Sequence, residues 1–165
     1  MISTAITNPS IKIISQHVFA EIIQNTETSQ NSLHAIVSFK KGALISTFSA
    51  GDTFSTPNYL TVQKGINEHI TLLPQFLQYI NHSCDPNVFF DTTSMEVIAL
   101  KDIQPNEEFS FFYPSTELDM AQPFLCYCGS RSCLQNIKGA KYIPGKILKK
   151  YRLTDFIQQQ LQHKL

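Results

Sequence analysis

The chain has 165 residues, which is enough for one well-buried core and too few for two full-sized domains. A hydrophobic content of 42%, a charged content of 16%, 12 Phe and 6 Tyr exclude a disordered or fibrous protein. The formal net charge of zero argues against binding to the phosphates of nucleic acids.

The first ten residues, MISTAITNPS, lack a basic start followed by an apolar stretch, and no later apolar run is long enough to span a membrane. We therefore expect a soluble cytoplasmic protein without a membrane partner, or a nuclear one in a eukaryotic host. In a reducing compartment, four cysteines indicate a metal site or a reactive thiol rather than disulfides.

Short β-type runs separated by turns dominate the first two-thirds of the chain, and most are too short for helices. Lys40-Lys41-Gly42 and Gln104-Pro105-Asn106-Glu107 have the residues of tight turns. Small, twisted, mostly antiparallel sheets are predicted from the runs 11–14, 18–23, 33–38, 43–49, 59–62, 69–73, 88–90, 96–100 and 108–113.

Helical signals are few and lie mainly near the C-terminus. A short helical segment over 74–80 begins at a proline and leads into a loop that carries NHSCDPN at 81–87. A helical turn is predicted at 146–151. Thr154 is a good cap for a helix through about His163, whose apolar stripe contains Phe156, Ile157 and Leu161.

Charges are unevenly distributed along the chain. Residues 84–120 hold eight acids against Lys101 alone, whereas residues 121–165 hold eight lysines and arginines against Asp155 alone. Two solvated faces and an acidic surface that docks a basic partner explain this pattern equally well.

The cysteines form a metal-binding pattern. Cys126, Cys128 and Cys133 give C-x-C-x4-C with Gly129 inside it, and the fourth cysteine, Cys84, lies 42 residues earlier. Structural zinc takes four ligands in a tetrahedron, so a site built on these three thiols needs a fourth ligand, for which Cys84 is the candidate thiol. Buried free cysteines are the alternative, which three thiols within eight residues disfavour. We predict one structural zinc ion, which would join the 126–133 segment to the NHSC loop.

Three separated motifs together resemble the SET-domain lysine methyltransferases that carry a post-SET zinc segment. Residues 81–87 resemble the family's NHSCxPN, residues 107–113 (EEFSFFY) its E-E-L-x-F-x-Y strand, and residues 126–133 its C-x-C-x4-C. Looser similarity extends over about residues 30–140.

The resemblance implies a mostly β, β-clip-like SET fold: several small antiparallel sheets around a knot-like crossing, short helices and a C-terminal helix. The strand ending at Tyr113 would thread beside the NHSC loop. The implied organisation is a SET domain at 1–120, a post-SET zinc-binding segment at 121–140 and a C-terminal helical extension at 141–165.

The implied activity is transfer of methyl groups from S-adenosylmethionine to an accessible lysine of a protein substrate, expected to be basic. Tyr113 would be catalytic and would also contact the cofactor. Phe111 and Tyr59 would line the lysine channel, with Phe111 pointing to the same side as Tyr113 and Phe112 to the opposite side. A Phe at position 111 favours di- or trimethylation. The other implied cofactor-binding residues are Ser32, Leu33, His34, Asn81 and His82.

Two departures from the family pattern stand out. Gln30-Asn31-Ser32 replaces a Gly-x-Gly turn, which we expect to affect cofactor affinity because glycine leaves the backbone free. Gln78 stands where an arginine is frequent. The main alternative is a SET-like zinc-containing binding module with weak or no catalysis that recruits a basic partner, and a redox or zinc-only structural protein is a further one.

Overall fold

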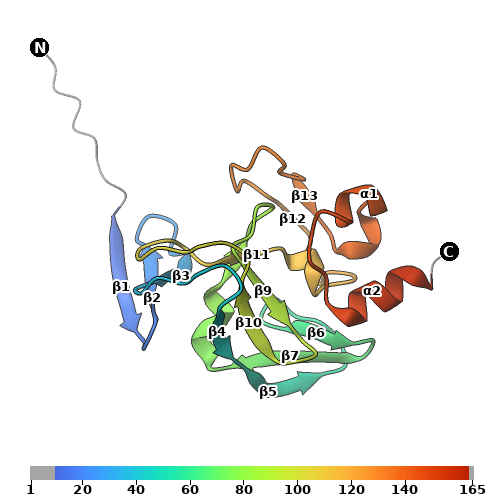
Figure 1. The fold of residues 1–165 in the computed structure, drawn as a ribbon, viewed down its shortest axis with the longest axis horizontal. Coiled ribbons are helices and arrows are strands. Elements are labelled where there is room, and N and C mark those ends of the chain that lie inside the picture. The colour runs from blue at the N-terminus through green and yellow to red at the C-terminus, as the bar shows by residue number, and fades with distance from the viewer. Residues whose placement is uncertain (1–9, 164–165) are drawn as a thin grey trace, which may run out of the picture.

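The computed structural model describes residues 10–163, which form many short strands and a few short helices (Figure 1). The strands are β1 (Ile11–Gln16), β2 (Ala20–Asn25), β3 (Asn31–Ala35), β4 (Leu44–Thr47), β5 (Ser49–Phe54), β6 (Val62–Gly65), β7 (Glu68–Leu73), β8 (Asn81–His82), β9 (Val88–Asp91), β10 (Glu96–Ala99), β11 (Ser110–Phe111), β12 (Phe124–Leu125) and β13 (Asn136–Ile137). The 3-10 helices are η1 (Gln75–Tyr79), η2 (Tyr113–Ser115) and η3 (Ala140–Tyr142), and the α-helices are α1 (Gly145–Leu148) and α2 (Asp155–Gln162).

The strands form five small sheets, as the turn-rich sequence predicts. Three sheets have three strands each, in the orders β1-β2-β3, β4-β10-β9 and β5-β7-β6, and β12 pairs with β13. All of these pairings are antiparallel, whereas β8 and β11 pair in parallel. The predicted fold class, mostly β with few helices, is confirmed.

One apolar core joins the sheets, and a smaller cluster lies under the late cysteines. The core contains side chains from β2, β3, β7, β9, β10 and the segment 109–111, with Leu33, Phe90 and Phe109 fully buried. The second cluster packs Met120, Phe124 and Leu134 around the cysteines and the buried Ile137. The second cluster joins the segment 120–137 to Cys84 in the loop after β8.

The segment 107–111 is threaded between two other parts of the chain. On one side, Phe109 N–H donates to Leu33 O at 2.8 Å in β3. On the other side, Ser83 N–H donates to Phe111 O at 3.0 Å, and Asn87 N–H donates to Ser110 O at 3.1 Å. The loop 81–87 therefore runs around this strand, which is the crossing that the family resemblance implied.

The predicted C-terminal helix is present and is capped as expected. The Thr154 hydroxyl oxygen accepts the Ile157 N–H, and α2 ends where His163 serves as the C-cap. Ile157 is fully buried, and Thr154 N–H donates to Ser115 O at 3.0 Å. The extension is thus joined to η2 through Thr154, and Figure 1 shows α1 near the β12–β13 pair.

Some element bounds differ from the predictions for local reasons. The predicted run 43–49 is divided at Phe48 into β4 and β5, and β5 is exposed along its whole length. The segment 59–62 is mainly a turn, because Asn58 caps it by accepting the Leu60 N–H. The last predicted strand stops at Phe111, since Pro114 favours the 3-10 turn η2. Within residues 10–163, none of the helices has the length and apolar character needed to cross a membrane.

Candidate active site

The four cysteines converge as the sequence predicts. The Sγ atoms of Cys84, Cys126, Cys128 and Cys133 all lie within 4.8 Å of one another. A zinc ion with sulfur ligands at about 2.3 Å places the sulfurs roughly 3.8 Å apart, so a small contraction completes the tetrahedron. Four thiols without a fifth donor form a closed set that suits a structural zinc ion rather than a catalytic one.

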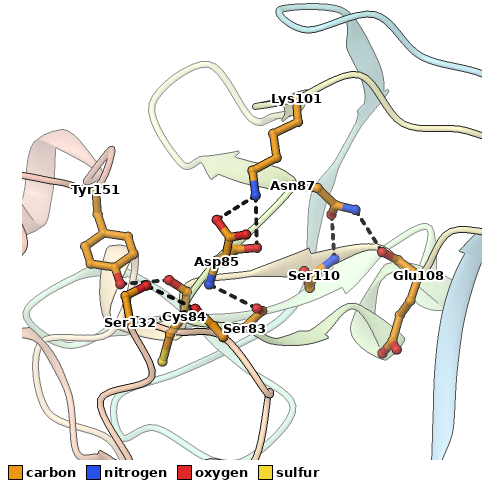
Figure 2. A network of polar contacts seen from close by, with 10 residues as sticks. Ser83, Cys84, Asp85, Asn87, Lys101, Glu108, Ser110, Ser132 and Tyr151 are labelled. Atoms are coloured by element: carbon orange, nitrogen blue, oxygen red, sulfur yellow. Dashed lines mark hydrogen bonds and ion pairs between the residues drawn. The ribbon is translucent and has the colours of Figure 1, made fainter.

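The peptide around the cluster is shaped for metal binding. Gly129 has φ +72°, a left-handed conformation that allows the chain to turn between Cys128 and Cys133. Leu134 N–H donates to Cys84 Sγ at 3.3 Å. The Tyr151 hydroxyl donates to Cys84 O at 2.8 Å, and Figure 2 shows Tyr151 meeting Cys84 and Ser132 on one side of the loop. Tyr151 of the C-terminal extension thereby holds the backbone of Cys84, the cysteine that is distant in sequence from the other three.

His82 connects the cluster to Tyr113. Tyr113 N–H donates to His82 Nδ1 at 3.2 Å, so Nε2 carries the proton and donates to Cys84 Sγ at 3.4 Å. Burial lowers the pKa of His82 to about 4, so the imidazole is neutral near pH 7. A neutral imidazole with both nitrogens occupied fixes the backbone at Tyr113 relative to the metal site.

Asn87 and Asp85 hold the same loop against its neighbours. Asn87 Nδ2 donates to Glu108 O at 2.8 Å, and Asn87 Oδ1 accepts Ser110 N–H at 2.8 Å. Figure 2 shows this amide spanning the crossing strand, with Asp85 paired to Lys101 beside it. The NHSCDPN motif therefore fixes its own loop around the strand that leads to Tyr113.

The residues predicted to bind the cofactor lie along one edge formed by β3 and β8, and their role stays a prediction. Asn81 Nδ2 donates to Asn31 O at 3.0 Å and to Glu108 Oε1 at 3.2 Å. Ser32 and His34 are half-buried and hydrogen-bond to each other at 2.9 Å. The Leu33 side chain is fully buried in the core, and its carbonyl accepts the Phe109 N–H, so its side chain is not available to a cofactor.

The chemistry of this edge fits S-adenosylmethionine. Asn31 Oδ1 is buried without a hydrogen-bond partner among residues 10–163, and the adjacent Asn81 and Glu108 supply further polar atoms. The cofactor carries ammonium and hydroxyl donors that such acceptors bind. Asn31, Asn81 and Glu108 would hold it, with Tyr113 at the inner end.

A cavity of about 340 Å³ lies beside Tyr113. Phe111 and Tyr113 contact each other with ring centroids 4.6 Å apart, and both line the cavity. Phe112 points the opposite way and stacks on Tyr151 at 3.7 Å, as strand alternation predicts. Tyr59 also lines the cavity but is 78% exposed, which places it at the mouth.

The cavity also contains a carboxylate that sequence reasoning placed on a docking surface. Glu117 belongs to the acidic run, yet it is only 7% exposed and lines the cavity. Its Oε1 accepts the Gln63 N–H at 2.9 Å and the Thr116 hydroxyl at 3.1 Å. Burial raises the pKa of Glu117 to about 7, although both hydrogen bonds oppose the shift. The sequence gives no sign that Glu117 is buried, because acidic residues in charged runs are usually exposed to solvent.

Other members of the acidic run are paired inside the molecule. Asp91 lies 3.4 Å from Arg152, Asp119 pairs with Lys141, and Asp102 lies 3.0 Å from Lys40. The pairs with Arg152 and Lys141 join the acidic middle to the basic C-terminal region, so these regions partly neutralise each other in the fold.

Glu117→Gln should stabilise the fold above pH 7. A carboxyl whose pKa is about 7 when folded and near 4.5 when unfolded binds more protons in the folded state, so stability falls as pH rises between these values. The variant has no carboxyl to deprotonate, so it should avoid this decrease in the free energy of unfolding, which is on the order of 3 kcal/mol. Urea unfolding at pH 4 and pH 8 measures the effect: the variant's advantage should be larger at pH 8, and an advantage that does not change with pH would contradict the buried carboxylate.

The SET domain family matches residues 9–114. Methyltransferase flvH of Aspergillus flavus is 35% identical over 146 residues, which cover 87% of this chain and 82% of flvH. The H3 lysine-36 specific histone-lysine N-methyltransferase of Aspergillus oryzae is 32% identical over 87 residues, covering 49% of this chain and 9% of that protein.

Solved structures share the fold. KRYPTONITE in complex with mCHG DNA and SAH superposes with a TM-score of 0.57 and 20% identity, covering 74% of this chain and 30% of that one. The methyltransferase domain of human histone-lysine N-methyltransferase SETMAR gives a TM-score of 0.50 and 18% identity, covering 80% of this chain and 59% of that one.

The fold, the cysteine cluster and these similarities define one class of protein. The chain belongs to the SET domain family, whose methyltransferases use S-adenosylmethionine as methyl donor.

Proposed function

We propose that this protein methylates lysine side chains of a protein substrate and adds more than one methyl group to each target. The observation that carries the proposal is the position of Tyr113. Its ring lies in the wall of an aromatic cavity next to the cysteine cluster, and the backbone of His82 offers a hydrogen bond to its phenol oxygen. The relatives named as histone-lysine N-methyltransferases support lysine as the acceptor.

The cavity suits the side chain of lysine. Phe111, Tyr113 and Phe124 offer aromatic surface to the four methylene groups, and Tyr59 at the mouth can cover the part nearest the substrate backbone. Enclosure by these rings excludes water and aligns the amine, which is the main contribution that a protein makes to this reaction. S-adenosylmethionine supplies a methyl carbon on a cationic sulfur.

Tyr113 acts in this proposal as a neutral hydroxyl. Burial raises the pKa of Tyr113 to about 12, and the negative charges of Glu108 and Glu117 add to the shift. The phenol therefore stays protonated, and its oxygen presents a fixed partial negative charge to the polarised methyl group.

Phe111 supports multiple methylation. Its ring packs edge-on against Phe90 with centroids 4.7 Å apart and carries no hydroxyl. A hydroxyl at this position would hydrogen-bond to the amine and restrict its rotation, whereas a phenyl ring leaves the nitrogen free to turn and to accept a second methyl group.

The test is methyl transfer from labelled S-adenosylmethionine to a panel of basic proteins and lysine peptides, followed by mass spectrometry of the product lysine. We expect label on lysine, with dimethyl- or trimethyllysine at long times. A protein that binds S-adenosylmethionine by calorimetry but labels no acceptor in the panel would favour the binding-module alternative. Product that stops at monomethyllysine would exclude the assignment of Phe111.

A further inference from the structure

One ionisable group in the cavity has no role in the reaction outlined above. Among the described residues that line the cavity, only Tyr59, Tyr113 and Glu117 can ionise, and no lysine, arginine or histidine is present. Gln78, which also lines it, is neutral. The cavity is therefore an aromatic and amide-lined space with one carboxylate and no cation of its own.

Hydrogen bonds fix the Glu117 side chain through one carboxylate oxygen and leave the other available to a ligand. Its Oε1 accepts the Gln63 N–H and the Thr116 hydroxyl, and Gln63 Oε1 in turn accepts the Leu118 N–H at 3.0 Å. The Glu117 backbone is fixed as well, since its N–H donates to Tyr113 O at 3.0 Å and its carbonyl accepts the Ala140 N–H at 2.9 Å. Its Oε2 has no hydrogen-bond partner within residues 10–163.

A purely structural role does not explain this arrangement. Anchoring β6 needs only Oε1, and the amide oxygen of a glutamine would accept the same two hydrogen bonds without a charge. A buried carboxylate without a cation costs stability, and a ligand that brings a cation into the cavity would offset this cost.

We propose that Glu117 receives the ammonium group of the target amine through Oε2 and accepts its proton before methyl transfer. This inference rests on the proposed function and deepens it. In the transfer, an N–H bond of the ammonium breaks and an O–H bond forms on Oε2. The neutral amine then forms the N–C bond with its lone pair as the S–C bond breaks and its electrons remain on sulfur. The proton on Glu117 leaves to solvent when the product departs.

The surroundings of Glu117 favour this exchange. In an apolar cavity an ammonium and a carboxylate in contact gain by becoming a neutral amine and a neutral acid, because neither charge is solvated there. An amine ordinarily loses its proton only near pH ~10.4. A carboxyl that titrates near neutrality is matched to take it at working pH.

Other ionisable groups packed around Glu117 do not replace it. Tyr113 stays protonated, and Tyr59 is at the exposed mouth. His69 of β7, opposite Gln63 in the sheet, has its pKa lowered by burial. Lys141, which follows the Ala140 that bonds the Glu117 carbonyl, pairs with Asp119.

The first test measures binding without any methyl donor, so it does not depend on turnover. The probe is Nα-acetyl-lysine amide, and its uncharged counterpart is Nα-acetyl-norleucine amide. At pH 8 the wild type should bind the lysine probe roughly tenfold or more tightly than the norleucine probe, and Glu117→Gln should lose that preference. Glu107→Gln, which removes an exposed carboxylate outside the cavity, should keep it.

The second test uses only the wild type and therefore does not depend on how the variant folds. Binding of the lysine probe should weaken roughly tenfold or more from pH 8 to pH 5.5, as Glu117 becomes protonated, whereas binding of the norleucine probe should not change. A preference retained in folded Glu117→Gln, or equal pH dependence of the two probes, overturns the proposal. A protein that passes both tests but labels no lysine would refute the proposed function and leave the ammonium site in place.

Discussion

Replacing Cys128 with serine is expected to abolish binding of the zinc ion and, with it, methyl transfer. The variant leaves three thiolates and a hydroxyl that does not ionise near neutral pH, so the tetrahedral site cannot close. Structural zinc contributes about 10–16 kcal/mol of binding free energy that becomes folding free energy. Met120 and Phe124 line the cavity and pack on the cysteine cluster, so this wall should loosen when the ion is lost.

Three measurements test whether loss of the metal ion also disrupts the cofactor site. Metal analysis should give one zinc ion per wild-type chain and none in Cys128→Ser. Hydrogen exchange should speed up over residues 120–137, and calorimetry should show that S-adenosylmethionine binding is lost. Ser132→Ala, which changes an exposed hydroxyl in the same turn, should retain the metal. Full activity after complete removal of zinc would contradict the coupling between cluster and site.

Burial raises the pKa of the Cys84 thiol, and raises that of Cys126 to about 11, so without a cation neither would ionise near neutrality. Metal binding must therefore release protons from these thiols, and loss of zinc in acid should begin at higher pH than for exposed thiols.

Local patterns were sufficient for several of the regular elements of this fold. Thr154 signals its helix through a capping hydroxyl and an apolar stripe, and Pro74 marks the entry to η1. β5 gives no such signal, because Ser49–Phe54 is exposed along its length and contains Gly51. The crossing of 107–111 through the loop 81–87 depends on contacts between distant segments, which spacing alone does not encode.

Some residues of the site were also predictable from local patterns and others were not. The cysteine cluster was predictable because a metal ion imposes a fixed number of ligands, so three thiols in one turn demand a distant fourth. The alternation that separates Phe112 from Phe111 and Tyr113 was predictable from strand geometry. Glu117 was not, because its burial follows from Gln63 of β6 folding over it, and nothing near Glu117 in sequence indicates that neighbour.

Tyr113→Phe is expected to slow methyl transfer roughly 100-fold or more while leaving the fold intact, since removing one preorganised polar group from a reacting centre typically has this effect. The two effects separate because the variant keeps the ring contact with Phe111 and the backbone N–H that donates to His82 Nδ1, and loses only the hydrogen bond between the His82 backbone and the phenol oxygen. Single-turnover transfer to a lysine peptide measures the rate. The free energy of unfolding, measured by thermal denaturation, should change by less than about 1 kcal/mol.

Two other tyrosines make matched controls, because each loses the same hydroxyl in a different setting. Tyr142 is 54% exposed and outside the cavity, so Tyr142→Phe should leave the rate unchanged. The Tyr151 hydroxyl donates to Cys84 O, so Tyr151→Phe should lose about 1 kcal/mol of stability through that hydrogen bond. If Tyr113→Phe loses stability as Tyr151→Phe does but transfers methyl groups at the wild-type rate, the phenol at 113 is a packing residue. A slow and stable Tyr113→Phe would mean that the hydroxyl acts on the reacting groups, since the fold would then have tolerated the loss of its hydrogen bond to the His82 backbone.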